Sequence, residues 1–125
     1  MSGNGYISVQ EICKNIMKGI NLDIFYLIRQ NQGIFKSEII RHFQQYDSAP
    51  KVAVSKYRHK VDIGIATLTG ARFIESRDGG RIDQFFLTKY GEEAAEFLGE
   101  LIENDPSIMF GSIIVNAVSK EDTEV

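Results

Sequence analysis

Apolar residues recur three or four residues apart along most of the chain, and this spacing predicts helices. The expected helices cover residues 9–18, 22–32, 36–46, about 53–68, 89–103 and 107–118. Ser8 stands before the first helix with Glu11 three residues later, which is the pattern of a capping box. The fourth helix is expected to start between Pro50 and Ser55, and Gly64 inside it indicates close packing or a bend.

The spacing changes once, between residues 72 and 87. Residues 72–76 and 81–87 read as strands, and Asp78-Gly79-Gly80 between them is a turn sequence. Thr88 follows the second strand and is expected to cap the next helix. The chain therefore predicts a mainly α protein with one small β-hairpin, in the α+β class.

The pattern also predicts how the chain is divided. Residues 1–7 are expected to be disordered, and residues 8–103 to form one domain. Residues 104–118 would form a C-terminal helix after Pro106, and residues 119–125 a disordered acidic tail. A length of 125 residues is enough for a single core.

Charge is divided unevenly along the chain, although its net value is only −3. Residues 51–90 carry eight Lys and Arg against four Asp and Glu, whereas residues 91–125 carry one against nine. A basic middle and an acidic end suit a protein that presents one face to a polyanion.

Two short patterns stand out, namely Leu68-x-x-x-x-Phe73-Ile74 and Phe86-Leu87-Thr88-Lys89-Tyr90-Gly91. Both resemble patterns in the winged helix-turn-helix regulators of the MarR and PadR families. In this pattern Leu87 points inward, Thr88 caps the next helix, and Gly91 allows its first turn to pack closely. The resemblance covers residues 22–103, but the loop 47–54 is longer than the tight turn of those families. It implies a winged helix-turn-helix with extra N-terminal and C-terminal helices.

The resemblance makes residues 53–68 a recognition helix and residues 72–87 a wing, with double-stranded DNA as the partner. Lysine and arginine neutralise phosphates, and arginine also reads guanine in the major groove. Lys36 would be a flanking phosphate contact. For Tyr57, partly buried packing is the alternative to a base contact. The candidate DNA-binding residues are Lys51, Ser55, Lys56, Tyr57, Arg58, His59, Lys60, Arg77 and Arg81.

The apolar residues near the C-terminus exceed what one small core needs, which predicts a homodimer. The alternative is that residues 108–118 fold back onto their own domain. The candidate dimerisation residues are Leu98, Leu101, Ile102, Phe110, Ile113 and Ile114.

No motif points to catalysis, so we expect a protein that is not an enzyme and has no cofactor or metal. Cys13 is the single cysteine and is expected to be a small core residue. No secretory signal or membrane span is visible, and the expected location is the cytoplasm.

Three functions remain open from the sequence. The leading one is a dimeric transcriptional regulator. The second is a plasmid-partition adaptor resembling TubR, which would coat repeated sites on DNA. The third is a winged helix that binds another protein, as the acidic total charge permits.

Overall fold

The computed structural model describes residues 8–47, 50–78 and 83–123. It is mainly helical with one small antiparallel sheet, so the expected α+β class is confirmed. The elements are α1 (Val9–Ile16), α2 (Gly19–Gln30), β1 (Ile34–Phe35), α3 (Lys36–Tyr46), α4 (Pro50–Gly70), β2 (Ile74–Asp78), β3 (Asp83–Leu87), α5 (Lys89–Asn104), the 3₁₀ helix η1 (Pro106–Met109) and α6 (Ile114–Thr123). No helix in the described ranges has the length and apolar character to cross a bilayer.

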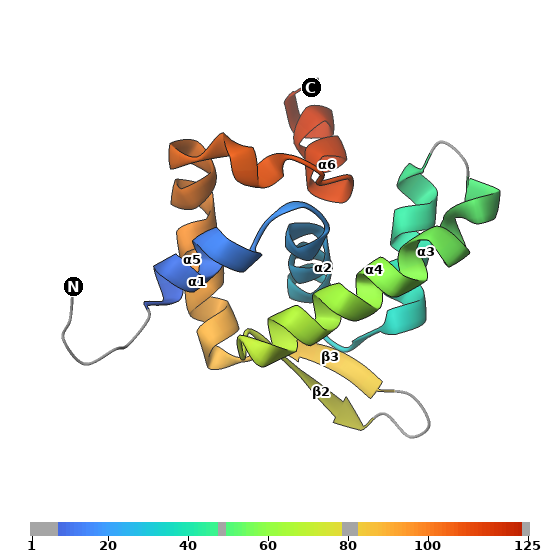
Figure 1. Cartoon of the computed structure of the whole chain (residues 1–125), viewed down its shortest axis with the longest axis horizontal. Helices are drawn as coiled ribbons and strands as arrows, with labels where there is room; N and C mark the ends of the chain where they lie inside the picture. The colour runs from blue at the N-terminus through green and yellow to red at the C-terminus, as the bar shows by residue number, and fades with distance from the viewer. Residues whose placement is uncertain (1–7, 48–49, 79–82, 124–125) are drawn as a thin grey trace.

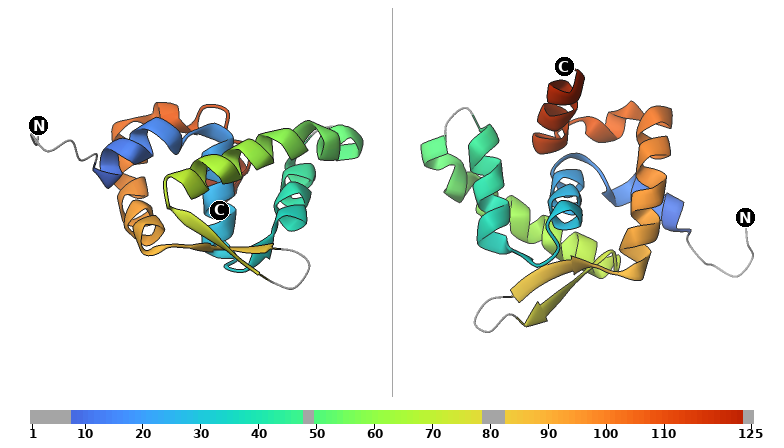
Figure 2. Two further views of the ribbon diagram at one scale, coloured as in Figure 1. Left: turned by 60° about the horizontal axis from the view of Figure 1, so that its bottom comes forward. Right: turned by 180° about the vertical axis from the view of Figure 1, so that it is seen from behind.

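Helix α2 lies at the centre of the molecule (Figure 1). The α1–α5 pair lies on one side of it and α3 on the other, while the sheet and the η1–α6 segment lie at opposite ends (Figure 2). Leu22, Ile24, Phe25 and Ile28 are all buried, because neighbours surround this helix. An apolar stripe this wide on one short helix is what a central position requires.

The sheet has three strands in the order β1-β3-β2, all antiparallel. In the predicted hairpin, Ile74 pairs with Leu87 and Ser76 with Phe85. Strand β1 was not expected from the sequence, because only two residues form it. It joins the outer edge of β3 by pairing Ile34 with Phe85, and thereby ties the hairpin to the end of α2.

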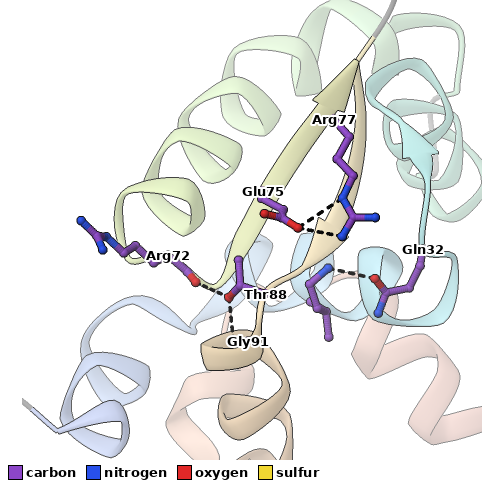
Figure 3. Close-up of polar contacts among 7 residues, drawn as sticks. Gln32, Arg72, Glu75, Arg77, Thr88 and Gly91 are labelled. Carbon is purple, nitrogen blue, oxygen red and sulfur yellow. Dashed lines mark hydrogen bonds and ion pairs between the residues drawn. The ribbon is translucent and has the colours of Figure 1, made fainter. Parts of the chain in front are cut away.

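The exit from the hairpin is held by a compact set of contacts around Thr88 (Figure 3). Its hydroxyl donates to the Arg72 carbonyl and accepts from the Gly91 amide, and its own amide donates to the Phe73 carbonyl. A Cβ atom on Gly91 would lie 2.1 Å from the Phe73 oxygen. The expected roles of Thr88 as a cap and Gly91 as a close-packing residue are therefore confirmed, and Leu87 is buried as expected.

The single helix expected over residues 107–118 is wrong. The chain instead forms η1, turns at Gly111 with a φ of +83°, and starts α6 at Ile114. Helix α6 continues to Thr123, so residues 119–123 are not the disordered tail that was expected. The expected disordered residues 1–7, 124 and 125 lie outside the described residues.

A buried carboxylate explains where α6 begins. Asp23 of α2 has no exposed surface, and it accepts hydrogen bonds from the Ile113 amide at 2.7 Å and the Val115 amide at 2.9 Å. The Ser112 hydroxyl donates to the same carboxylate at 2.7 Å. These donors are the amides that a helix N-terminus leaves unpaired. Asp23 thus caps α6 from a distant part of the chain.

Gly91 and Gly99 give a matched pair of substitutions in α5. Gly91→Ala should lower the free energy of unfolding by about 3 kcal/mol, because its methyl group meets a backbone oxygen that side-chain rotation cannot move. A Cβ atom on Gly99 would meet nothing within 4 Å, so Gly99→Ala should raise it by about 0.5–1 kcal/mol. Urea unfolding of the two variants measures both values, and equal stabilities would contradict the close packing at Gly91.

Asp23→Asn should lower the free energy of unfolding by about 1–3 kcal/mol, because an amide group cannot accept all of these hydrogen bonds. Burial raises the pKa of Asp23 above its usual 3.8, against the lowering effect of the hydrogen bonds from Val115, Ile113 and Ser112. The folded state therefore holds this proton more tightly than the unfolded chain does. The stability that Asp23 contributes is full below pH 3.8 and is lost as the pH rises through the folded pKa.

Urea unfolding of both proteins at pH 4 and pH 7 tests this pH dependence. The difference in stability between the wild type and Asp23→Asn should be larger at pH 4. A difference that grows toward pH 7 would mean that the ionised carboxylate is the favoured form.

Candidate nucleic-acid interface

The candidate interface is built on α4, which packs against α2 and α3. The buried residues Tyr57, Val61, Gly64 and Leu68 form one line along this helix. A Cβ atom on Gly64 would lie 2.4 Å from Cδ1 of Ile24, so α4 approaches α2 closely here. The missing side chain is what lets α4 lie against the central helix, and its close packing was one of the two expectations for Gly64.

Because one side of α4 packs against α2 and α3, three of the candidate DNA-binding residues on its other sides face solvent. Arg58, His59 and Lys60 are all exposed on α4. Arg58 and Lys60 form no ion pair with any side chain that the structure describes. Their positive charges are available to a ligand.

Tyr57 has to be removed from the list of candidate DNA contacts. Only 1% of its surface is exposed, and its ring stacks on Phe43 with the centroids 5.0 Å apart. Its hydroxyl donates to Oδ2 of Asp47 at 2.6 Å. Burial, followed by the hydrogen bond to Asp47, raises the pKa of Tyr57. The side chain therefore joins α3 to α4, in line with the packing alternative.

Lys56 is exposed, but it is held by the same carboxylate. Its Nζ lies 3.0 Å from Oδ2 of Asp47, whose side chain is only 4% exposed. The hydrogen bond to Asp47 raises the pKa of Lys56. A phosphate at Lys56 would have to compete with a carboxylate that is almost removed from water, so this residue is a weaker candidate than Arg58 or Lys60.

Lys36 is also paired. Its Nζ lies 3.0 Å from Oδ1 of Asp62 on α4, and both side chains are about half exposed. The pair joins the start of α3 to the middle of α4. It also neutralises an acid that would otherwise repel phosphate beside His59.

Arg77 comes from β2 rather than from α4 (Figure 3). Its guanidinium lies 2.8 Å from Oε1 of Glu75 and 4.1 Å from the centre of the Phe86 ring. The side chain is still 60% exposed, so this exposed pair leaves it within reach of a ligand. The N-terminal half of α4 lies on the side of the molecule away from α1 and α5, whereas the hairpin lies at the sheet end, where β3 contacts α5 (Figures 1 and 2).

Comparison with known proteins gives no family. We found no protein-family model that matches the chain and no curated protein with significant similarity to it.

Three further candidates lie outside the described residues or side chains, namely Lys51, Ser55 and Arg81.

One exposed residue on α4 was not selected from the sequence. Ile63 is 52% exposed, one helical turn after His59. Its spacing from the predicted core residues Val61, Ile65 and Leu68 could have placed it on the outer side.

The candidate dimerisation residues divide between core and surface. Leu101 and Ile114 are buried within the chain's own core, and Leu98, Ile102 and Ile113 are partly buried against it. Ile108 is also fully buried, so this segment folds back onto its own domain, which was the alternative to a dimer contact. Phe110 differs from these residues, because 78% of its surface is exposed.

Other kinds of site find little support among the described residues. They contain no group of three or more His, Cys, Asp or Glu placed to hold a metal ion. Cys13 is buried as expected, and burial raises the pKa of its thiol to about 11, which disfavours the reactive thiolate. A hollow of about 120 Å³ lies between α1 and α5, lined by Lys14, Phe97 and Leu101 among others. Small-molecule pockets usually exceed about 300 Å³.

Tyr57→Phe tests the structural role of this residue. Losing the hydrogen bond to the buried Asp47 should lower the free energy of unfolding by about 1.5–3 kcal/mol. Tyr46→Phe is the control, because Tyr46 is 36% exposed and should change stability by less than about 0.5 kcal/mol. Urea unfolding separates the two outcomes, and an unchanged stability for Tyr57→Phe would remove the proposed link between α3 and α4.

Proposed function

We propose that this protein binds double-stranded DNA as a winged helix-turn-helix transcriptional regulator. In this proposal α4 is the recognition helix and the β2–β3 hairpin is the wing. The order of three helices, a hairpin and a further helix supports it. The pairing of β1 with β3 supports it further, because it fixes the hairpin to the helices that would carry the recognition surface.

The observation that carries the proposal is the exposed and unneutralised charge of Arg58 and Lys60. Both side chains are exposed on one long helix, and neither is neutralised by a described acid. Such cations release counterions from DNA when they contact phosphates, which drives binding. An α-helix also fits the width of the major groove.

The hairpin would add a second contact. Arg77 is exposed at 60%, and its stacking on Phe86 keeps the guanidinium near the outer face of the sheet. Winged proteins use this part of the fold to reach the DNA backbone or the minor groove. The pairing with Glu75 makes its contribution smaller than that of Arg58 or Lys60.

Self-association is part of the proposal, and Phe110 is the observation that favours it. A large apolar side chain exposed at 78% gains about 2 kcal/mol or more when it is buried in an interface. A two-fold dimer would present two copies of α4 to half-sites about one DNA turn apart. Sedimentation at micromolar concentration measures the oligomeric state, and the wild type should form a dimer that Phe110→Ser weakens.

Arg58→Ala/Lys60→Ala should weaken binding to duplex DNA by about tenfold at 0.1 M salt. The slope of log affinity against log salt should fall by about two, because two phosphate contacts are lost. Fluorescence anisotropy over a salt series gives both quantities. Both side chains are exposed, so the stability of the variant should stay within about 0.5 kcal/mol of the wild type.

Lys14→Ala/Lys18→Ala is the matched control, because it removes the same charge from exposed positions on α1 and just before α2, outside the candidate interface. It should leave the salt slope unchanged. Equal losses of DNA affinity in the two double variants would show that the proposed DNA-binding face is wrong. An absence of wild-type binding to any duplex at low salt would leave the protein-interaction alternative, and binding to an array of repeats would favour the partition adaptor.

A further inference from the structure

The outer side of α4 carries a strip that contains no Asp, Glu, Lys or Arg. His59, Ile63 and Ala66 follow one another at intervals of four and three residues, and all three are exposed. Residues at these intervals lie on one face of a helix. They lie opposite the line from Tyr57 to Leu68 that is buried against α2 and α3. The strip is therefore the part of α4 that projects farthest from the protein.

Ile63 is the unusual member of this strip. It is a β-branched apolar residue that is 52% exposed, and such residues are slightly unfavourable in exposed helix positions. Ala66 extends the apolar surface by one turn. The fold therefore gains little from isoleucine here, and a ligand is the better explanation for an apolar side chain at this point.

Two cations stand on either side of the strip. Arg58 and Lys60 are the sequence neighbours of His59, so each projects about 100° from it around the helix, in opposite directions. Ile63 and Ala66 thus lie between two positive charges, and the acid beside them, Asp62, is paired with Lys36. The major groove of DNA has the complementary arrangement, with base edges at its floor and phosphates along both rims.

We propose that Ile63, together with Ala66, contacts the C5-methyl groups of thymines in the major groove. This inference rests on the proposed function, and it makes Ile63 a residue that determines sequence specificity. Thymine is the base that offers an apolar group in this groove. A protein groove could also accept Ile63, but the flanking cations favour a polyanion.

The test begins with duplexes selected from random DNA by the wild-type protein. Each thymine of the selected half-site is then replaced by deoxyuridine, which removes the methyl group and keeps the base pairing. At one or two positions the wild type should lose about fourfold in affinity, the value expected for one buried methyl group. Ile63→Ala should bind the thymine duplex about four- to tenfold more weakly and should not respond to the replacement at those positions.

Thr69→Ala is the control, since Thr69 is an exposed β-branched residue of α4 outside the strip. It should keep the wild-type response to deoxyuridine. Binding of Ile63→Ala to unrelated duplex, and its salt slope, should equal those of the wild type. These measurements separate a lost base contact from a lost phosphate contact.

The remaining outcomes overturn either the inference or its basis. If Ile63→Ala responds to deoxyuridine as the wild type does, or if the wild type binds all sequences equally, the thymine contact is wrong and DNA binding stands. If the wild type binds no duplex at low salt, the proposed function itself fails. If Ile63→Ala alters sedimentation rather than DNA binding, Ile63 belongs to an interface between two copies.

Discussion

The structure depends on the burial of α2 on all sides. Its residues Leu22, Ile24, Phe25 and Ile28 need apolar neighbours in every direction, and these come from both ends of the chain. Ile108 and Ile114, far along the sequence, are fully part of this core. The segment 106–123 is therefore a structural part of the domain, although its Phe110 stays exposed. The one ionisable side chain on the buried surface of α2, Asp23, has hydrogen-bond partners because the start of α6 supplies its donors.

The same constraint decides what α4 can offer to a ligand. Gly64 lets α4 approach Ile24, and this contact fixes the rotation of α4 about its own axis. Once Tyr57 and Leu68 face inward, Arg58 and Lys60 have to face solvent on either side of His59. The candidate interface is thus held by the core, through the rigid helix that carries it. Rigid elements place ligand-contacting side chains more accurately than loops do.

Local sequence predicted most of the fold, and contacts between distant residues account for the rest. The hairpin, the Thr88 cap and Gly91 could be recognised because each depends on residues within a few positions of one another. Strand β1 could not, because two residues become a strand only through pairing with β3. The break in the segment 107–118 depends on Asp23, about ninety residues earlier. Tyr57 was a candidate DNA contact with packing as the alternative, and its spacing of four residues from Val61 indicated the buried side of α4, where it lies.

Charge counts along the sequence also gave an incomplete picture of the surface, because they omit pairing. Lys36, Lys56 and Arg77 each form an ion pair with an acid. The three acids differ in exposure, and therefore in the cost of breaking the pair. Glu75 and Asp62 are about half exposed, so water can replace their partners at little cost. Asp47 is 4% exposed, so a phosphate at Lys56 would have to compete with a carboxylate that is almost removed from water. Lys56 therefore joins α4 to Asp47 at the end of α3, and in the proposed function the phosphate contacts are made by Arg58 and Lys60.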